Sequence, residues 1–185
     1  MSSFPESNDA ICTYTGRIIR PLDPDPEQID ILDIAHALSN QCRYTGHTSR
    51  YYSVAQHSVL VSEITDYDDA LWGLLHDGTE AYISDIARPV KNAEGFGVIY
   101  REAEEKLTAA VAVRFNLPYD GVLPKSVKWA DDVLLYTEMR DLMPGIIREA
   151  IPKNAEYLDM NLNECWSPQE SKWRFLKRYK ELTNG

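Results

Sequence analysis

The sequence predicts an all-α protein with a single domain, and three observations support that class. Apolar residues recur at steps of three and four along several segments, which is typical of helices with one buried face. Alternating strand patterns do not run beyond a few residues, and the chain holds neither an internal repeat nor a low-complexity segment. The length of 185 residues allows one hydrophobic core, so we expect one domain over residues 1–185.

The predicted helices follow a proline-rich turn near the N-terminus. Three prolines between Pro21 and Pro26 exclude a helix interior or a central strand there. Glycine disfavours helices by about 1 kcal/mol relative to alanine, so we expect the helix to bend at Gly78, or a neighbour to need the space. Pro89 is expected to end that region. The predicted helices cover residues 27–43, 53–64 with Ser53 as N-cap, 68–77, 100–115 with Glu102, Glu104 and Glu105 near its positive end, 124–143 and 169–182.

The charge balance limits the class of partner. Lysine and arginine number 19 against 29 acidic residues, for a net charge of −10. A polymeric nucleic acid or an anionic membrane surface is therefore not expected as a partner, whereas a small anion remains possible if positive charge is concentrated locally. No apolar stretch is long enough for a membrane span, and residues 1–10 lack a signal-peptide pattern, so we expect a cytoplasmic protein. The three cysteines are far apart, which disfavours disulfides and cysteine zinc sites.

The four histidines and their acidic neighbours predict a cation site. His76 and Asp77 are adjacent, and Glu80 follows three residues later, on the same helical face as Asp77 if the helix continues. Asp131 is embedded among apolar residues, where a carboxylate needs a partner. His57 is expected on the core side of the preceding helix, where it can meet the His76 helix. Together, His57, His76, Asp77 and Asp131 form a plausible divalent-metal site in a helical bundle.

The same residues carry a family resemblance. Residues 74–91, from Leu74 through His76-Asp77 to Lys91, closely resemble the signature of the YfbR-like 5′-deoxynucleotidases and their phage relatives, the deoxyadenosine triphosphate triphosphohydrolases (DatZ). Residues 43–44, 53–58 and 130–131 extend the resemblance over most of residues 29–141. The chain thus resembles the HD-domain metal-dependent phosphohydrolases, and the fold implied is an HD-domain helical bundle. It departs from the family pattern in having Tyr44 for tryptophan and Gly78 for alanine.

The resemblance implies a role for each matching residue. His57, His76, Asp77 and Asp131 would be the metal ligands, and Ala130 favours Asp131 over Asp132 for the last position. Glu80 would be the acid–base or water-positioning group, and Asp77 would also be a catalytic residue. A second ion, if one binds, would lie near Glu80 and Asp85. The resemblance and the neighbouring loop also suggest the residues that contact substrate: Arg43, Tyr44, His47, Asp85, Pro89 and Lys91.

The reaction implied is hydrolysis of deoxyadenosine nucleotides, dATP to deoxyadenosine plus triphosphate, with dADP and dAMP as further substrates. One alternative is a broad 5′-deoxynucleotidase acting on monophosphates, and another is a nucleotide-sensing HD module without turnover. Cyclic-nucleotide or guanosine-tetraphosphate hydrolysis is a weaker alternative. The metal would be Zn²⁺, Co²⁺, Mn²⁺ or Mg²⁺, and the resemblance implies a homo-oligomer, either dimer or hexamer.

Other charged and polar residues have structural interpretations beside the functional ones. His36 lies off the apolar stripe of its helix and is interpreted as a partly exposed structural residue. His47 follows a glycine between Arg43 and Arg50, so it can touch phosphate or make a loop hydrogen bond. Lys91 can contact phosphate or be solvated. The basic residues 172–180 are spread around an amphipathic helix, which favours a solvated or subunit-facing helix over nucleic-acid binding.

Overall fold

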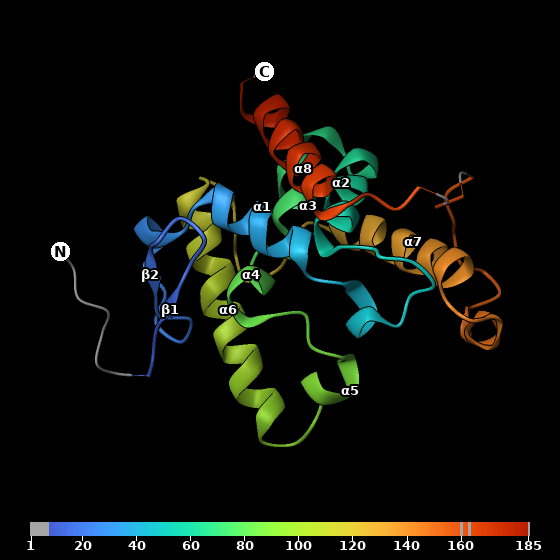
Figure 1. The fold of residues 1–185 in the computed structure, drawn as a ribbon, viewed down its shortest axis with the longest axis horizontal. Coiled ribbons are helices and arrows are strands. Elements are labelled where there is room, and N and C mark those ends of the chain that lie inside the picture. The colour runs from blue at the N-terminus through green and yellow to red at the C-terminus, as the bar shows by residue number, and fades with distance from the viewer. Residues whose placement is uncertain (1–7, 160, 163, 185) are drawn as a thin grey trace.

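Helices make up most of the protein, which confirms the predicted all-α class. The computed structural model describes residues 8–159, 161–162 and 164–184, and residues 1–7, where no leader pattern was found, lie outside that description. A small antiparallel hairpin of β1 (Ile11–Cys12) and β2 (Ile18–Ile19) precedes the helices (Figure 1). The α-helices are α1 (Ile31–Asn40), α2 (Val54–Ile64), α3 (Ala70–Leu75), α4 (Glu80–Ile83), α5 (Arg88–Lys91), α6 (Phe96–Arg114), α7 (Lys125–Leu142) and α8 (Pro168–Thr183). Short 3-10 helices cover Pro26–Gln28, Arg43–Gly46, Tyr67–Asp69 and Gly145–Ala150.

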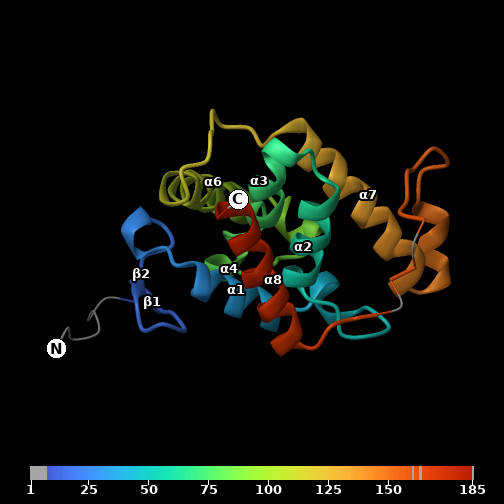
Figure 2. The same cartoon turned by 90° about the horizontal axis from the view of Figure 1, so that it is seen from above.

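Helix α2 lies at the centre of the fold. It packs against α1, α3, α7 and α8, so helices cover it on several sides (Figure 2). Every residue from Val54 to Ser62 is buried. A helix surrounded in this way buries its polar side chains too, and each of them needs a partner inside the protein. His57, in the middle of α2, is therefore held completely inside the bundle.

The capping residues explain where several helices begin. Ser53 is the N-cap of α2, as predicted, and its hydroxyl accepts a hydrogen bond from the Gln56 N–H. The single helix predicted over residues 27–43 is wrong in its bounds. The backbone at Asp30 is extended, and its carboxylate caps α1 by accepting from the Leu32 N–H, so α1 starts only at Ile31.

The helix predicted over residues 68–77 ends earlier, at Leu75. A turn at residues 76–79 separates α3 from α4, and the Gly78 N–H donates to the Leu75 carbonyl at 2.8 Å. A Cβ at position 78 would lie 2.9 Å from that oxygen, which is closer than ordinary contact. The bend expected at Gly78 is thus present. The expectation that Asp77 and Glu80 share one helical face is wrong, because Glu80 begins the next helix.

The later helices match the predictions with two exceptions. Helix α6 begins at Phe96 rather than residue 100, so its first turn holds none of the predicted acidic residues. The periodicity misses this start because Val98 and Ile99 are exposed and outside the core. Pro89 does not end the region either; it occupies the second position of the short helix α5, where proline is tolerated. The bounds of α7 and α8 agree with the predicted 124–143 and 169–182 to within a residue or so. Across the described ranges, none of the helices combines the length and apolarity that crossing a membrane requires.

Candidate metal centre

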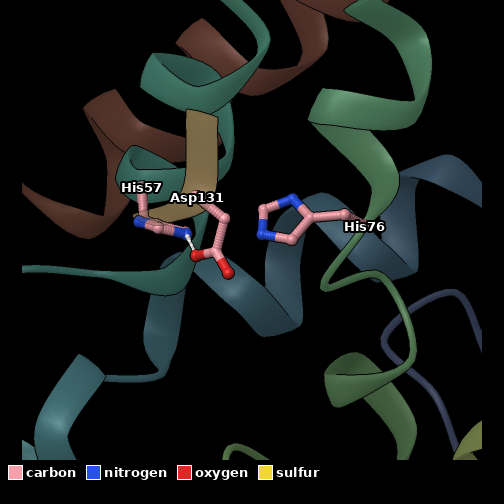
Figure 3. A group of neighbouring side chains, drawn as sticks. All are labelled: His57, His76 and Asp131. Carbon is pink, nitrogen blue, oxygen red and sulfur yellow. Dashed lines mark ion pairs between the residues drawn. The ribbon is translucent and has the colours of Figure 1, made fainter. Parts of the chain in front are cut away.

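His57, His76 and Asp131 come together from three different parts of the chain. One nitrogen of each histidine and one oxygen of Asp131 all lie within 4.8 Å of one another, so this cluster could hold a metal ion. The three side chains point toward one another from α2, the end of α3, and α7 (Figure 3). Nε2 of His57 lies 3.2 Å from Oδ1 of Asp131. Residues far apart in the sequence therefore converge as predicted.

Asp77, the fourth predicted ligand, lies against both histidines but outside this three-residue group. Its Oδ2 lies 3.3 Å from Nε2 of His76 and 3.7 Å from Nε2 of His57. Two histidine nitrogens with carboxylate oxygens are donor types that Zn²⁺, Co²⁺ or Mn²⁺ accept, and Asp77 is near enough to both histidines to be a candidate fourth donor.

The close packing of α3 on α2 brings the two imidazole rings together. A Cβ at Gly73 would lie 2.7 Å from Oγ1 of Thr65, so only glycine allows this approach without a shift. The centroids of the His57 and His76 rings are consequently 5.2 Å apart. The carbonyl of Gly73 also accepts a hydrogen bond from Nδ1 of His76 at 2.8 Å. Gly73 thus permits the close packing of α3 on α2, and its backbone carbonyl orients the His76 ring.

The hydrogen bonds of the two rings test whether a cation fits. A carbonyl can only accept, so Nδ1 of His76 carries the proton and Nε2 is left to face the cluster. Nδ1 of His57 is 2.6 Å from Oε1 of Glu138, which leaves its Nε2 facing the same point. Among the described residues, both Nε2 atoms are buried and make no hydrogen bond, although carboxylate oxygens of Asp131 and Asp77 lie 3.2 and 3.3 Å from them. Imidazoles anchored at one nitrogen with the other directed at a shared point are typical of metal ligands, so the residues fit a divalent cation.

The pKa values of the cluster reflect the need for positive charge. Burial raises the pKa of Asp77, but neighbouring His76, His57 and Arg43 together hold that pKa well below its ordinary value. Burial lowers the pKa of His76, but Asp77 above all, with Asp131, raises that pKa to about 9. Without a metal, a protonated imidazole therefore balances the carboxylates.

Asp131 and Asp132 have different surroundings although they are adjacent. The Asp131 side chain is 34% exposed and faces His57. Asp132 is on the outside of α7 and pairs with Lys128 one turn earlier on the same helix. The structure thus brings Asp131, and not Asp132, to the cluster, in line with the preference from the sequence.

A pocket of about 620 Å³ opens over the cluster. Asp77 and Asp131 form part of its lining, which places the cation site at the base of an open cavity. All of the residues predicted to contact substrate also line it: Arg43, Tyr44, His47, Asp85, Pro89 and Lys91. Arg88, which the sequence did not single out for binding, adds a third cation to the wall.

Two of the cationic side chains in the pocket pair with acidic residues. The guanidinium of Arg43 contacts Glu138 through Nε at 3.1 Å and Asp77 through Nη1 at 3.3 Å. Nζ of Lys91 contacts Glu80 at 3.4 Å and Glu104 at 3.3 Å. These pairs hold the cations at the pocket wall with their charge partly neutralised.

Glu80 has the surroundings of a group that exchanges protons. Burial, followed by the charges of Asp77 and Asp85, raises its pKa well above the ordinary value, while Lys91 and Arg43 oppose that rise. Its Oε2 is buried without a hydrogen-bond partner in the described part of the chain. A carboxyl with a raised pKa beside a cation site is a candidate general acid or base.

The loop that carries Arg43 and Tyr44 has an unusual backbone. Tyr44 and Thr45 both have positive φ, 54° and 52°, a region that residues with a Cβ rarely adopt. The hydroxyl of Tyr44 lies 3.0 Å from Oε2 of Glu138, so this side chain is anchored inside the protein. His47 is exposed at the pocket rim. Strained backbone held by buried contacts is typical of functional loops.

Sequence reasoning missed two residues that organise the site. Glu138 contacts His57, Arg43 and Tyr44. It stands seven residues after Asp131, on the same face of α7 two turns later, and this spacing was the available signal. Gln41 was the second, and its side chain joins the Glu80 carbonyl to the Asp85 N–H. No sequence pattern marks it, because both of its partners are backbone atoms.

Two structural interpretations from the sequence also agree with the fold. His36 is partly buried and stacks on Tyr14 with 3.8 Å between the ring centroids. On α8, Arg174 pairs with Glu170, and Lys177 pairs with Glu181, each one turn away along the helix. These pairs fit a helix whose charges are neutralised locally.

Comparison with known proteins places the chain among relatives from bacteria. No protein-family model matches it. It is 36% identical over 180 residues to the uncharacterized protein YfdR of Escherichia coli (strain K12), covering 94% of this chain and 95% of that protein. It is also 43% identical over 125 residues to an uncharacterized protein of Rhodobacter capsulatus, covering 63% of this chain and 62% of that protein. The near full-length match shows that the chain belongs to the family of YfdR.

Proposed function

We propose that the protein is a metal-dependent phosphohydrolase of the HD-domain type that acts on deoxyadenosine nucleotides. The favoured reaction converts dATP to deoxyadenosine and triphosphate, with dADP and dAMP as further substrates. The observation that carries the proposal is the convergence of His57, His76 and Asp131, with Asp77 beside both histidines, at the base of a pocket with cationic walls. Such a pocket combines a place for a Lewis acid with groups that bind phosphate oxygens.

A divalent cation bound to the cluster would polarise a phosphoryl oxygen and make water more acidic. The protein's own residues do the remaining work. Water attacks the α-phosphorus, the bond to the 5′-oxygen breaks, and the 5′-oxygen takes up a proton. Glu80 is placed at the pocket wall to move that proton, and Arg43 and Lys91 hold the negative charge of the phosphates. Tyr44 and Pro89 offer surfaces for the sugar and base.

The proposal includes Zn²⁺, Co²⁺, Mn²⁺ or Mg²⁺ as the cation. A second ion would lie near Glu80 and Asp85, which face the same pocket. The buried Oε2 of Glu80, without a hydrogen-bond partner among the described residues, supports that location. We further propose that the substrate is a free nucleotide rather than a nucleic acid, and that the enzyme works in the cytoplasm as a homo-oligomer.

One observation favours a second candidate, a 5′-deoxynucleotidase that acts on monophosphates. Arg43 and Lys91 both pair with carboxylates, so little of their positive charge is left for a long phosphate chain. A single phosphate needs fewer such contacts than triphosphate. The two candidates share the cation site and differ in the product released.

A substrate panel tests the proposal. Purified protein is incubated with each dNTP and dNMP, in turn with Mg²⁺, Mn²⁺, Co²⁺ or Zn²⁺, and the products are separated by chromatography. Free triphosphate from dATP is the expected result. Orthophosphate from monophosphates alone would favour the second candidate, and binding without turnover would indicate a nucleotide-sensing module. Adding cyclic nucleotides and guanosine tetraphosphate tests for a different hydrolase of this type.

Adjacent aspartates provide a matched control for the panel. Asp131→Asn removes one of the four predicted ligands and should abolish metal binding and turnover. Asp132→Asn removes the same charge one residue later, where the side chain pairs with Lys128 on the surface, and should leave both unchanged. Equal behaviour of the two variants would contradict the proposed site.

A further inference from the structure

Glu138 is completely buried in α7, beneath the pocket, and its carboxylate touches three functional side chains. Oε1 lies 2.6 Å from Nδ1 of His57. Oε2 lies 3.1 Å from Nε of Arg43 and 3.0 Å from the hydroxyl of Tyr44. The two oxygens therefore face different parts of the site, one the cation cluster and the other the pocket wall.

The arrangement of donors determines what Glu138 does to each neighbour. A buried carboxylate is stable only when donors surround it, and here a ring N–H, a guanidinium N–H and a hydroxyl fill that role. Because Oε1 accepts from Nδ1 of His57, the other ring nitrogen is directed toward Asp131 and His76. Because Oε2 accepts from Arg43, the guanidinium is fixed with Nη1 turned toward Asp77.

We propose that Glu138 is a positioning residue that fixes the cation-binding His57 and the phosphate-binding Arg43 relative to each other. This inference rests on the proposed function. One carboxylate fixes the tautomer of His57 and the placement of Arg43 and Tyr44, so the distance between the cation and the bound phosphate depends on it. Without Glu138, Arg43 would keep only Asp77 of its two acidic partners, and that contact competes with the cation for the same carboxylate.

The Glu138→Gln variant tests whether both oxygens of this carboxylate are needed, one for His57 and the other for Arg43 and Tyr44. An amide has one oxygen, so it can accept from His57 or from Arg43 and Tyr44, and its NH₂ group then opposes a donor on the other side. Glu138→Asp keeps the charge with a shorter reach and should recover part of the function. Asp132→Asn, an exposed acid removed from the same helix, is the control for loss of charge alone.

The test measures Mn²⁺ affinity by titration calorimetry, together with kcat, KM and the melting temperature with and without a chelator. We expect Glu138→Gln to weaken Mn²⁺ binding by about 10–100-fold and to raise KM, with Glu138→Asp intermediate and Asp132→Asn unchanged. A lower melting temperature with unchanged Mn²⁺ affinity and KM would mean a purely structural role and would overturn the inference.

A measurement on the unchanged protein covers the case in which the variant does not fold. In the Zn²⁺-loaded protein, nitrogen NMR of the imidazoles should show the proton of His57 on Nδ1, in slow exchange with water. A proton on Nε2 instead would overturn the role of Glu138. If the unchanged protein binds no divalent cation, the proposed function fails as well. If it binds cations and turns over substrate while Glu138→Gln behaves identically, only the inference fails.

Discussion

The ammonium group of Lys91 lies 3.4 Å from Oε1 of Glu80, at the wall of the pocket. Glu104 of α6 approaches the same ammonium to 3.3 Å from the other side. Burial lowers the pKa of Lys91, but the two carboxylates together raise it above its ordinary value, so the lysine stays charged. Lys91 in turn opposes the rise in the pKa of Glu80. The pKa of Glu80, the proposed proton-transfer group, thus depends on whether Lys91 contacts Glu80 alone or Glu80 and Glu104 together.

Changing Lys91 or Glu104 should move the pH profile of turnover in opposite directions. In Glu104→Gln, Lys91 has Glu80 as its one remaining acidic partner among the described contacts. The pKa of Glu80 therefore falls, and the acid limb of the kcat/KM profile moves to lower pH. Lys91→Met removes the positive charge, so that limb moves to higher pH. The substrate ionises identically in all variants, and pH profiles of kcat/KM therefore report the protein. Identical limbs in both variants would contradict the role of Glu80 as a base.

Replacing Glu80 should separate turnover from cation binding. We expect Glu80→Gln to lower kcat by about 10²–10⁴-fold, because a positioned acid or base contributes roughly that much. Its affinity for one divalent cation should stay close to that of the unchanged protein, because the other four residues form the cluster. Asp77→Ala should abolish both. Calorimetry and rate measurements on the same preparations check this, and wild-type rates in either variant would refute the assigned roles.

Gln41 should matter for both stability and substrate binding. Its amide joins the Glu80 carbonyl at 2.9 Å to the Asp85 N–H at 3.2 Å, across Ser84, whose φ is 68°. Gln41→Ala loses both bonds and should lower the free energy of unfolding by about 1–2 kcal/mol and raise KM. Urea unfolding and steady-state kinetics provide the measurements.

The neighbouring Asn40 supplies a matched control for that change. Its amide donates to the His36 carbonyl at the exposed end of α1, and no hydrogen bond joins it to Glu80 or Asp85 among those of the described residues. Asn40→Ala should therefore leave KM unchanged and cost less stability. An equal rise of KM in both variants would indicate that the effect of Gln41 is not local.

The metal-free protein should lose stability as the pH rises from about 6.5 to about 9. The pKa of His76 is about 9 in the folded chain against 6.5 as the reference value. A group whose pKa is raised by folding stabilises the folded state fully at pH values below its unfolded pKa. This stabilisation is lost as the pH rises through its folded pKa. Melting temperatures measured in chelator across this range should fall, and His76→Gln should flatten the curve. Saturating Zn²⁺ should also reduce the slope, because the bound cation replaces the proton.

The periodicity of apolar residues was enough to predict the all-α class and most helices. The cap at Ser53 marked the start of α2 correctly, because such a signal acts within one turn of the chain, and the predicted starts at 124 and 169 lie within one residue of those of α7 and α8. The start of α6 was missed because its first turns are exposed and carry no periodic burial. The break after α3 was visible only as Gly78, and its position at Leu75 was decided by how the turn packs.

The sequence by itself determined the kinds of group available for the site: two histidines, two aspartates and a glutamate in an order that suggests a cation cluster. The tertiary structure decided how these groups are held. His57 and Glu138 are 81 positions apart, and Arg43 and Glu138 are 95 apart. Contacts over such separations leave no periodic trace along the chain, because they arise only when α2, α7 and the loop after α1 pack together. Burial then makes these contacts obligatory, since a carboxylate without donors would not be stable inside the bundle.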